Sequence, residues 1–308
     1  MTVSSRIGEG QHSVLLTGAA SQIGYFLIPR LAAAGYRVQA VSRRGELQAT
    51  RIFGSRWGGA GAAHWVQADP VQPGLGVPAR GCSTWIHLGP LALLPPRLGE
   101  MAAAGVSRVI AFGSTSRFTK ADSVHPKDQR TVATLAAGEA ALASECTQHG
   151  LGWTLFRPTL IHGAGLDRNV MVIAGAIRRF RFFPLVGGGA GLRQPVHADD
   201  LALACVQAIG TGQSRNRAYD LSGGEVLSYR DMVIRIFAAL DRPARFLPVP
   251  VAAVGLALWG LSHLPRYRDF NVEMARRMTQ DMVFAHDEAA HAFAFSPRGF
   301  QPVVEPPA

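Results

Sequence analysis

Short apolar runs alternate with longer segments of helical periodicity through the first half of this chain. The runs "SVLLTG", "TWIHL" and "RVIAFGS" have the length and composition of buried strands. The intervening segment "QIGYFLIPRLAAAG" places its apolar residues on one helical face and ends in a glycine, as helices commonly do. Because parallel strands need such crossover helices, the alternation predicts an α/β fold built on a doubly wound parallel sheet.

The same patterns extend to about residue 165 and then loosen. Residues 12–165, with six strands ending at "GWTLFRP", are expected to form a dinucleotide-binding domain of Rossmann type to which 194–224 return. Residues 166–193 and 225–308 are expected to form a smaller C-terminal substrate lobe. Later helices are predicted at about 129–149, at 170–180, from 199 with Asp199 or Asp200 as N-cap, at 229–240 and at 251–264.

Composition limits the environments and partners of the chain. The formal net charge is +10, and Lys120 and Lys127 are the only lysines, so the basic residues are almost all arginines. Arginine binds phosphates well, which permits small anionic ligands, acidic lipid surfaces and nucleic acid as partners. The arginines are spread along the chain with little aromatic interleaving, an argument against nucleic acid. We therefore expect a phosphate-bearing small molecule.

Cysteines and apolar stretches predict a cytoplasmic protein. Cys82, Cys146 and Cys205 have neither metal-site nor disulfide-framework spacing. The first thirteen residues contain no apolar core of the kind a secretory signal needs. The longest apolar stretch, residues 249–264, is shorter than the ~20 residues of a membrane span and is interpreted as a packed helix.

The segment "LLTGAASQIG" has the form of a strand, a glycine turn and a helix start. Such a turn brings backbone N–H groups and the positive end of the helix dipole to one point, where a pyrophosphate can bind. Gly18 makes the tight turn and Gly24 permits close packing of helix on strand, while Ser21 replaces the central glycine of the usual pattern. The residues predicted to contact the dinucleotide phosphates are Gly18, Ala20, Ser21, Gln22, Ile23 and Gly24.

The end of the second strand predicts which dinucleotide is preferred. NAD-binding sites carry an acid there for the ribose 2′-hydroxyl, whereas this strand ends in Ser42, Arg43 and Arg44. Two guanidinium groups suit a 2′-phosphate, so the sequence predicts NADP(H) rather than NAD(H). The alternative is that both arginines only solvate a loop.

Further motifs follow in an order that resembles the short-chain dehydrogenase/reductase superfamily, in particular its NAD-dependent epimerase/dehydratase branch. "TGAASQIG" is similar to the glycine motif of that family, and "VSRVIAFGSTS" to the strand that carries its catalytic serine or threonine. The resemblance implies that Asp69 and Pro70 lie at the adenine and that Leu88 and Gly89 line the middle of the cofactor. "LFRPTLIHGAG" and "LRQPVHADDLALA" are similar to segments that flank the nicotinamide and substrate, which adds the cofactor contacts Pro158 and Thr159.

The chain departs from the family at its catalytic pair. With Glu139 taken as the acid that follows the Tyr-x-x-x-Lys pair, the tyrosine and lysine positions hold Val132 and Ala136, and no tyrosine has a lysine four residues on. Hydride transfer at a carbonyl carbon needs a matched proton transfer, which valine and alanine cannot provide. Candidate replacements are Ser114 and Ser116, which follow the fifth strand, and His125, whose type has an ordinary pKa of about 6.5. Ser114 alternatively only ends the strand.

Three further features of the sequence bear on the binding of ligands. By resemblance, Asn169 and Arg193 approach the diphosphate of a substrate, and a surface role is the alternative for Arg193. "RRFRFFP" (178–184) fits a membrane face, a cap on the substrate cleft or a packed interface between lobes. The histidines His64, His87 and His162 share no metal-ligand spacing, so no metal site is expected, and His197 is interpreted as structural.

These features give two functional hypotheses. The first is an NADP(H)-preferring oxidoreductase, epimerase or dehydratase that acts on a nucleotide-diphosphate sugar, or a similar alcohol or carbonyl compound, through a nonstandard proton donor. The second is a non-catalytic NADP(H)-binding sensor or assembly and scaffold protein, and a lapse of cofactor binding is a third possibility. The resemblance also implies pairing into a homodimer through the helix at 129–149 and its predecessor. A peripheral membrane contact is left open.

Overall fold

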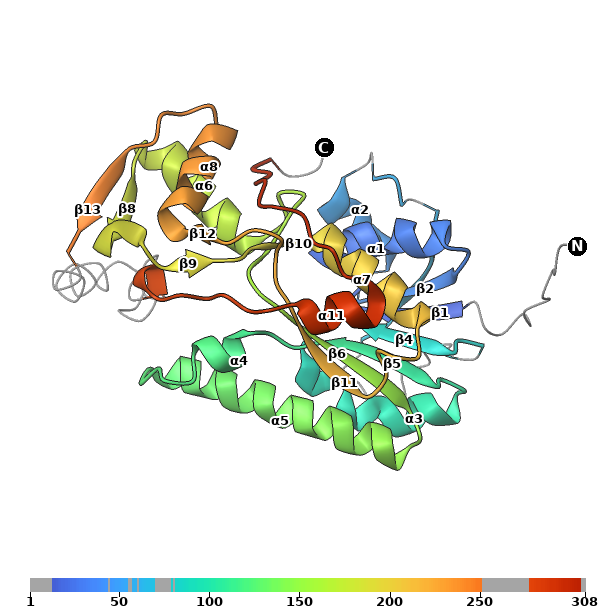
Figure 1. Cartoon of the computed structure of the whole chain (residues 1–308). Coiled ribbons are helices and arrows are strands. Elements are labelled where there is room, and N and C mark those ends of the chain that lie inside the picture. Colours follow the sequence, from blue (N-terminus) through green and yellow to red (C-terminus); the bar gives the residue numbers. More distant parts are fainter. Residues whose placement is uncertain are drawn as a thin grey trace, which may run out of the picture.

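Seven parallel strands form the central sheet of the computed structural model, which describes residues 13–43, 45–54, 57–59, 61–69, 79, 81–250 and 277–305. Their spatial order is β11-β6-β5-β4-β1-β2-β3 (Figure 1). The strands are β1 (Ser13–Thr17), β2 (Arg37–Ser42), β3 (His64–Gln67), β4 (Thr84–His87), β5 (Arg108–Phe112), β6 (Gly152–Pro158) and β11 (Arg217–Leu221). The predicted α/β fold is confirmed, and β11 extends the predicted six strands by one at the edge beside β6.

Helices cover both faces of this sheet because its strands are apolar on both sides. Leu16 and Ile86 pack toward α1 and α7, whereas Leu15 and Trp85 pack toward α3 and α5. Figure 1 shows these two pairs of helices on opposite faces of the sheet. The helices of this half are α1 (Gln22–Ala33), α2 (Glu46–Phe53), α3 (Leu98–Ala103), α4 (Ser116–Thr119), α5 (Pro126–Gln148), α7 (Ala198–Gly210) and α11 (Asp287–Phe293), with short turns η1 (Leu91–Leu93) and η2 (Pro95–Arg97).

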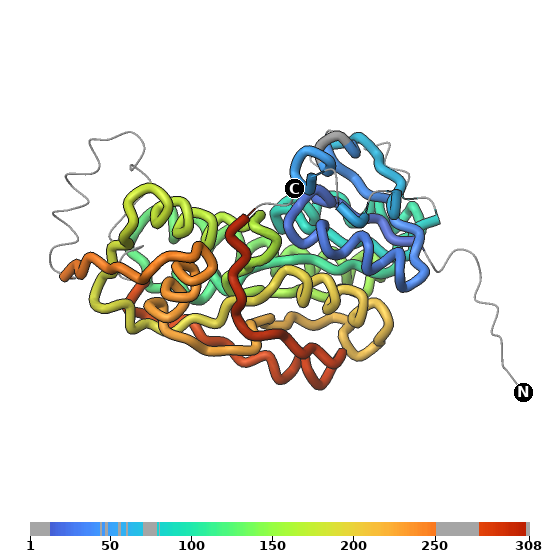
Figure 2. Tube along the Cα trace, turned by 90° about the horizontal axis from the view of Figure 1, so that it is seen from above, coloured from blue at the N-terminus to red at the C-terminus, as the bar shows by residue number. Residues whose placement is uncertain are grey.

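A second, smaller apolar core belongs to the C-terminal lobe. It contains Ile173 and Ile177 from one helix and Val233 and Ile236 from another, together with Phe300 near the C-terminus. The C-terminal segment runs between the lobe and the half that carries β1 (Figure 2). The elements of the lobe are α6 (Arg168–Phe180), α8 (Tyr229–Ala239), β8 (Phe183–Val186), β13 (Phe246–Val249), η3 (Gly187–Gly189) and η6 (Arg277–Thr279). Two short strand pairs lie between the two parts. They are β7 (Ile161–His162) with β10 (Val196–His197), and β9 (Leu192–Arg193) with β12 (Leu227–Ser228).

Two helix starts differ from those predicted. The N-cap of α7 is His197, whose ring accepts from the Asp199 N–H, because both aspartates are engaged by Arg30 and Arg298 instead. Helix α5 begins at Pro126, a residue well suited to a first helical position. Helix α11 lies within the predicted lobe range 225–308 but packs against α7 and β11, where Phe293 is buried. The helix predicted at 251–264 lies outside the described residues.

Candidate functional site

The turn between β1 and α1 is shaped by two glycines. Gly18 has a φ of +71°, and a Cβ there would lie 2.9 Å from the amide nitrogen of Gly89. A Cβ at Gly24 would lie 1.9 Å from the carbonyl oxygen of Ala19. Any larger residue at either position would push backbone apart, so the sequence requires glycine at both. The result is a narrow backbone cradle at the carboxyl ends of β1 and β4.

Ser21 completes this cradle by capping α1. Its hydroxyl oxygen accepts from the N–H of Gly24 at 3.3 Å, which leaves the hydroxyl proton available to a ligand. Gln22 donates its amide to the Gly163 carbonyl at 3.0 Å and so ties the turn to the segment after β6. Ile23 is buried in the core, and Ala20 is half-buried in the turn. The helix start thus retains the geometry of an anion site.

The end of β2 is placed beside this turn by its pairing with β1. The Ser42 hydroxyl donates to the Gly45 carbonyl at 2.7 Å, so its proton is already used within the loop. Arg43 is exposed, and Asp69 follows β3 in a half-buried position. Arg44 and Pro70 lie outside the described residues. Among the residues predicted to bind the ribose of the cofactor and described by the structure, Arg43 therefore carries a positive charge that is exposed to solvent.

The loop after β4 is held by a buried histidine. The Trp85 indole donates to the Thr17 hydroxyl (2.8 Å), which pairs with His87 Nδ1 (2.7 Å), while His87 Nε2 lies 3.2 Å from the carbonyl oxygen of Pro90. All these groups are satisfied when the ring is neutral, with Nε2–H donating and Nδ1 accepting. Burial lowers the pKa of His87 to about 4, in agreement with a neutral ring. His87 thereby fixes Leu88 and Gly89 against Gly18.

The predicted catalytic residues lie in the segment between β5 and α5. The Ser114 hydroxyl accepts from the Ser116 N–H at 3.1 Å, at the start of α4. The His125 ring caps α5 by accepting from the Lys127 N–H at 3.3 Å through Nδ1, so a neutral ring carries its proton on Nε2. The half-buried positions of Ser114, Ser116 and His125 leave all three partly open to solvent.

The segment after β6 borders the same edge of the sheet. The Pro158 carbonyl accepts from both the N–H and the hydroxyl of Thr115, which joins it to the segment that carries Ser114. Thr159 donates its hydroxyl to the Gln194 carbonyl. The predicted contacts Pro158 and Thr159 thus lie beside the predicted catalytic segment.

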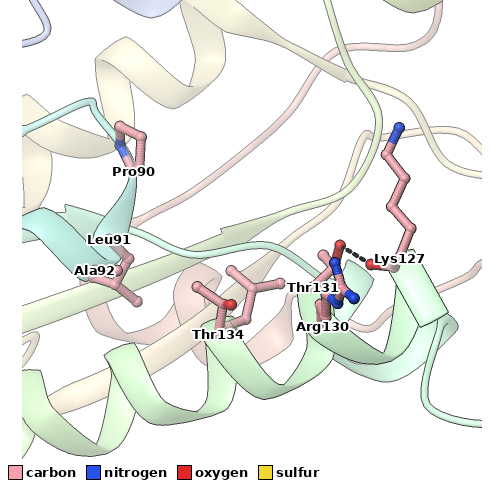
Figure 3. Close-up of a pocket in the computed structure, with 8 residues that line it drawn as sticks. Pro90, Leu91, Ala92, Lys127, Arg130, Thr131 and Thr134 are labelled. Carbon is pink, nitrogen blue, oxygen red and sulfur yellow. Dashed lines mark hydrogen bonds between the residues drawn. The ribbon is translucent and has the colours of Figure 1, made fainter.

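A groove of about 410 Å³ lies between the loop after β4 and the first half of α5 (Figure 3). Pro90 and Leu91 form one side, and Thr131 and Leu135 form part of the other. Its complete lining is Pro90, Leu91, Ala92, Lys127, Arg130, Thr131, Thr134 and Leu135. The groove combines apolar walls with two cationic side chains, a composition that suits an anionic organic molecule.

The two residues predicted to contact substrate phosphates have different surroundings. The Arg193 guanidinium is buried, donates to the carbonyls of Leu192 and Gln280 at 2.7 Å each and to that of Arg277, and lies 5.2 Å from the ring centroid of Tyr229. Arg193 therefore binds its own chain rather than facing open space. Asn169 is exposed in the first turn of α6.

No family model matches the chain. The chain is 25% identical over 210 residues to the uncharacterized protein y4nG of Sinorhizobium fredii, a match that covers 64% of this chain and 52% of that protein. Over 137 residues it is 28% identical to the mitochondrial NADH dehydrogenase [ubiquinone] 1 alpha subcomplex subunit 9 of Arabidopsis thaliana, which covers 42% of this chain and 34% of the subunit. Over 116 residues it is 28% identical to the NAD(P)H azoreductase of Xenophilus azovorans, covering 37% and 38% of the two chains. The matches span about half or less of these relatives.

Solved structures match nearly the whole chain. A dTDP-glucose 4,6-dehydratase of Streptomyces venezuelae, solved with NAD and TYD, has a TM-score of 0.67 at 15% identity and covers 94% of this chain and 92% of its own. The UDP-glucuronic acid 4-epimerase of Bacillus cereus, solved with NAD, has a TM-score of 0.68 at 14% identity over 92% and 93% of the two chains. This chain has the fold of the NAD-dependent epimerases and dehydratases. The resemblance seen in the sequence is thereby confirmed at the level of the fold.

In this epimerase/dehydratase fold, α5 carries two buried carboxylates, Asp128 and Glu139, whose ion-pair partners the sequence did not predict. Asp128 accepts from Ser123 at 3.0 Å, pairs with Lys120 at 3.1 Å, and also pairs with Arg277 of the lobe. Burial raises the pKa of the Asp128 carboxyl, but the hydrogen bonds and charges of these partners outweigh it, so the pKa lies below its usual value. In an α-helix, residues 128, 132 and 139 lie on the same face, so their spacing in the sequence could have indicated that Asp128 and Glu139 flank the position of Val132.

The second carboxylate, Glu139, lies against the end of β5. It pairs with Arg157 at 2.7 Å and with Arg117, and a Cβ built at Gly113 would lie 3.2 Å from its oxygen. Val132 and Ala136 lie between the two acids on α5, both half-buried. The epimerase/dehydratase fold therefore keeps charged anchors at both ends of the stripe and apolar residues at the two positions between them.

Metal and membrane features complete the description of this epimerase/dehydratase fold. Within the described ranges, no group of three or more His, Cys, Asp or Glu side chains is placed to hold a metal ion. In the same part of the chain, no helix is both long enough and apolar enough to span a bilayer.

Proposed function

We propose that this chain binds a nicotinamide dinucleotide at the turn after β1, with NADP(H) preferred to NAD(H). The observation that carries the proposal is the turn at Gly18 and Gly24, where an added Cβ would collide with the backbone of Gly89 or Ala19, so the chain keeps the tight glycine turn that dinucleotide phosphates require. The free proton of Ser21 and the start of α1 supply donors for the pyrophosphate. Exposed Arg43 at the end of β2 supports a 2′-phosphate contact.

We further propose that the protein transfers hydride at an alcohol or carbonyl carbon, which is the chemistry a bound nicotinamide supplies. Ser114 would orient the substrate oxygen at the end of β5. His125 is suited to move the proton, because its Nδ1 is engaged by the Lys127 N–H and its Nε2 remains the exchangeable position. Ser114 and His125 would thus take the role of a tyrosine and a lysine, which Val132 and Ala136 cannot perform.

The substrate is proposed to bind in the groove between the loop after β4 and α5, facing the lobe. Lys127 and Arg130 on its wall suit an anionic group, such as the diphosphate of a nucleotide sugar. The solved relatives named above, a dTDP-glucose dehydratase and a UDP-glucuronic acid epimerase, support this class. Because Arg193 is engaged by carbonyls of its own chain, we assign the phosphate contacts to Lys127 and Arg130 instead.

A second candidate function is a cofactor-binding sensor or scaffold without turnover. The apolar pair Val132 and Ala136 favours this function, because α5 has the buried ion pairs of Asp128 and Glu139 but no tyrosine or lysine between them. The two functions share the dinucleotide site and differ in whether Ser114 and His125 affect a rate.

Fluorescence titration with NADPH and NADH tests the shared step. The wild type is expected to bind NADPH more tightly, and Arg43→Asp to reverse the preference, because a carboxylate repels the 2′-phosphate and accepts from a 2′-hydroxyl. An Arg43→Asp protein that still prefers NADPH would refute the assignment of Arg43. A difference between wild type and Ser114→Ala in NADPH oxidation, at equal NADPH affinity, would separate the enzyme from the sensor.

A further inference from the structure

The end of the C-terminal lobe carries a strongly basic surface. We call it the lobe tip and define it as residues 178–186 and 242–249, which cover the last turn of α6, β8 and β13. These two segments contain five arginines and no aspartate or glutamate, and Asp241 flanks the second segment. Figure 1 shows β8 and β13 at the opposite end of the molecule from β1 and α2. The lobe tip is therefore separate from the dinucleotide cradle.

Large apolar side chains are exposed on the lobe tip between these arginines. Phe180, Phe182 and Leu247 are 44%, 39% and 51% exposed. The rings of Phe180 and Phe182 lie 6.2 Å apart between centroids, and the parallel pairing of Pro184 with Leu247 brings the two segments side by side. Clustered apolar groups of this size on a surface are typical of an interaction site.

The arginines of the lobe tip divide into two groups. Arg178 donates to the Val304 carbonyl and Arg242 to the carbonyls of Ile177 and Arg178, so these two stabilise the lobe itself. Arg179, Arg181 and Arg245 are exposed. Arg179 lies 5.3 Å from the ring centroid of Phe180, and the carbonyl of Arg245 accepts from the Phe183 N–H. Three exposed cations thus lie in the same two segments as the exposed rings.

We propose that the lobe tip docks on an anionic lipid surface. The guanidinium groups of Arg179, Arg181 and Arg245 would contact lipid phosphates, while Phe180, Phe182 and Leu247 enter the boundary between headgroups and acyl chains. A bilayer interface satisfies both kinds of side chain at once, because it presents phosphates directly above an apolar layer. Such a contact is peripheral and requires no spanning segment.

Sedimentation of the full chain with vesicles tests this docking. The wild type is expected to bind vesicles of phosphatidylcholine mixed with phosphatidylglycerol, to bind pure phosphatidylcholine weakly, and to be released by added salt. Phe180→Ser/Phe182→Ser and Arg179→Gln/Arg245→Gln should each weaken binding to the mixed vesicles by about tenfold or more, since both the insertion and the charge contribute. Arg51→Gln/Arg217→Gln, with exposed arginines from the other half of the molecule, should bind as the wild type does.

Three results would overturn the proposal. The first is a wild type that does not bind anionic vesicles. The second is binding of the lobe-tip variants that equals wild-type binding. The third is a loss of binding in Arg51→Gln/Arg217→Gln as large as that in Arg179→Gln/Arg245→Gln. Competition by single-stranded RNA that depends on the same residues and is stronger than lipid binding would assign the surface to nucleic acid instead. Unchanged thermal unfolding and NADPH titration of the lobe-tip variants show that any loss is local and independent of the proposed cofactor site.

Discussion

The turn after β1 and the first half of α5 both lie at the carboxyl ends of the strands, yet they resemble the epimerase/dehydratase sequence motifs to different extents. The turn has Ser21 in place of the motif's central glycine but has both Gly18 and Gly24, whose neighbours leave no space for a side chain. Helix α5 has the buried anchors Asp128 and Glu139 and, by the resemblance in sequence, Val132 and Ala136 at the positions expected for a reactive tyrosine and lysine.

This comparison separates backbone requirements from side-chain requirements. A phosphate cradle made of backbone N–H groups tolerates replacement of a residue that only lines it, so Ser21 for glycine preserves the shape and even adds a cap. Proton transfer needs a specific side chain at a specific place, and a single substitution removes it. We therefore expect dinucleotide binding to tolerate Ser21, and proton transfer from α5 to be absent with Val132 and Ala136.

Introducing a tyrosine and a lysine on α5 should have the largest effect of the changes considered, because it supplies the proton donor that this helix lacks. In Val132→Tyr/Ala136→Lys, NADPH-dependent reduction of a panel of aldehydes and ketones should rise by roughly 10²- to 10⁴-fold, the usual contribution of a positioned acid. Each single variant should gain much less. A folded double variant that binds NADPH and shows no gain with any carbonyl compound would mean that this face of α5 does not meet the nicotinamide.

Removing the anchor of α5 should destabilise the fold. Glu139→Ala leaves the Arg117 and Arg157 guanidinium groups without their carboxylate and should lower the free energy of unfolding by about 3 kcal/mol in denaturant titrations. Glu145→Ala, on the same helix but 40% exposed, should change it by less than about 0.5 kcal/mol. Equal effects at both positions would contradict a buried anchoring role for Glu139.

The turn can be tested by a single methyl group. Gly24→Ala should lower the free energy of unfolding by about 1–3 kcal/mol and weaken NADPH binding, because its Cβ would overlap the Ala19 carbonyl. Gly175→Ala in α6 has open space around its Cβ and should stabilise the protein by about 0.5–1 kcal/mol. If Gly24→Ala matches wild type in stability and affinity, the cradle is not as narrow as described.

At neutral pH the smallest effect concerns a buried histidine outside both regions, whose contribution depends on pH. Neither ring nitrogen of His162 has a hydrogen-bond partner, and burial, with the nearby charge of Arg298, lowers its pKa to about 3. Between about pH 6.5 and 3 the unfolded chain binds more protons at this group than the folded one, so wild-type stability falls as the pH falls. His162→Phe should keep the contact with Phe300, change stability little at pH 7 and show a shallower loss by pH 4. Parallel pH curves for the two proteins would show that His162 does not titrate in this way.

The sequence predicted the layered fold well because its strands and helices carry clear local periodicities. Leu15 and Leu16, adjacent in β1, pack on opposite faces of the sheet, as expected for a strand apolar on both sides. The N-cap of α7 was mispredicted because two aspartates preceded by a histidine satisfy the local rule equally well. Only the distant arginines Arg30 and Arg298 determine that His197 caps the helix.

Side-chain partners far apart in sequence explain what else could not be predicted. Asp128 meets Arg277, 149 residues away, so its role as a link between sheet and lobe has no local signature. The sequence likewise assigned Arg193 to a substrate phosphate, where the structure shows it bound to carbonyls near residue 280. By contrast, Gly24 is constrained by Ala19 within the same motif, so the glycine pattern could be interpreted from the sequence alone, although the contact of Gly18 with Gly89 could not.

A calorimetric titration of NADPH into the wild type and into Ser21→Gly tests the central claim, that the cradle still holds a dinucleotide although its central glycine is gone. The account predicts that both proteins bind NADPH with affinities within about tenfold of each other, because Ser21 lines the site without blocking it and glycine is a tolerated helix cap. If neither folded protein binds NADPH or NADH, or if only Ser21→Gly binds, the claim is contradicted.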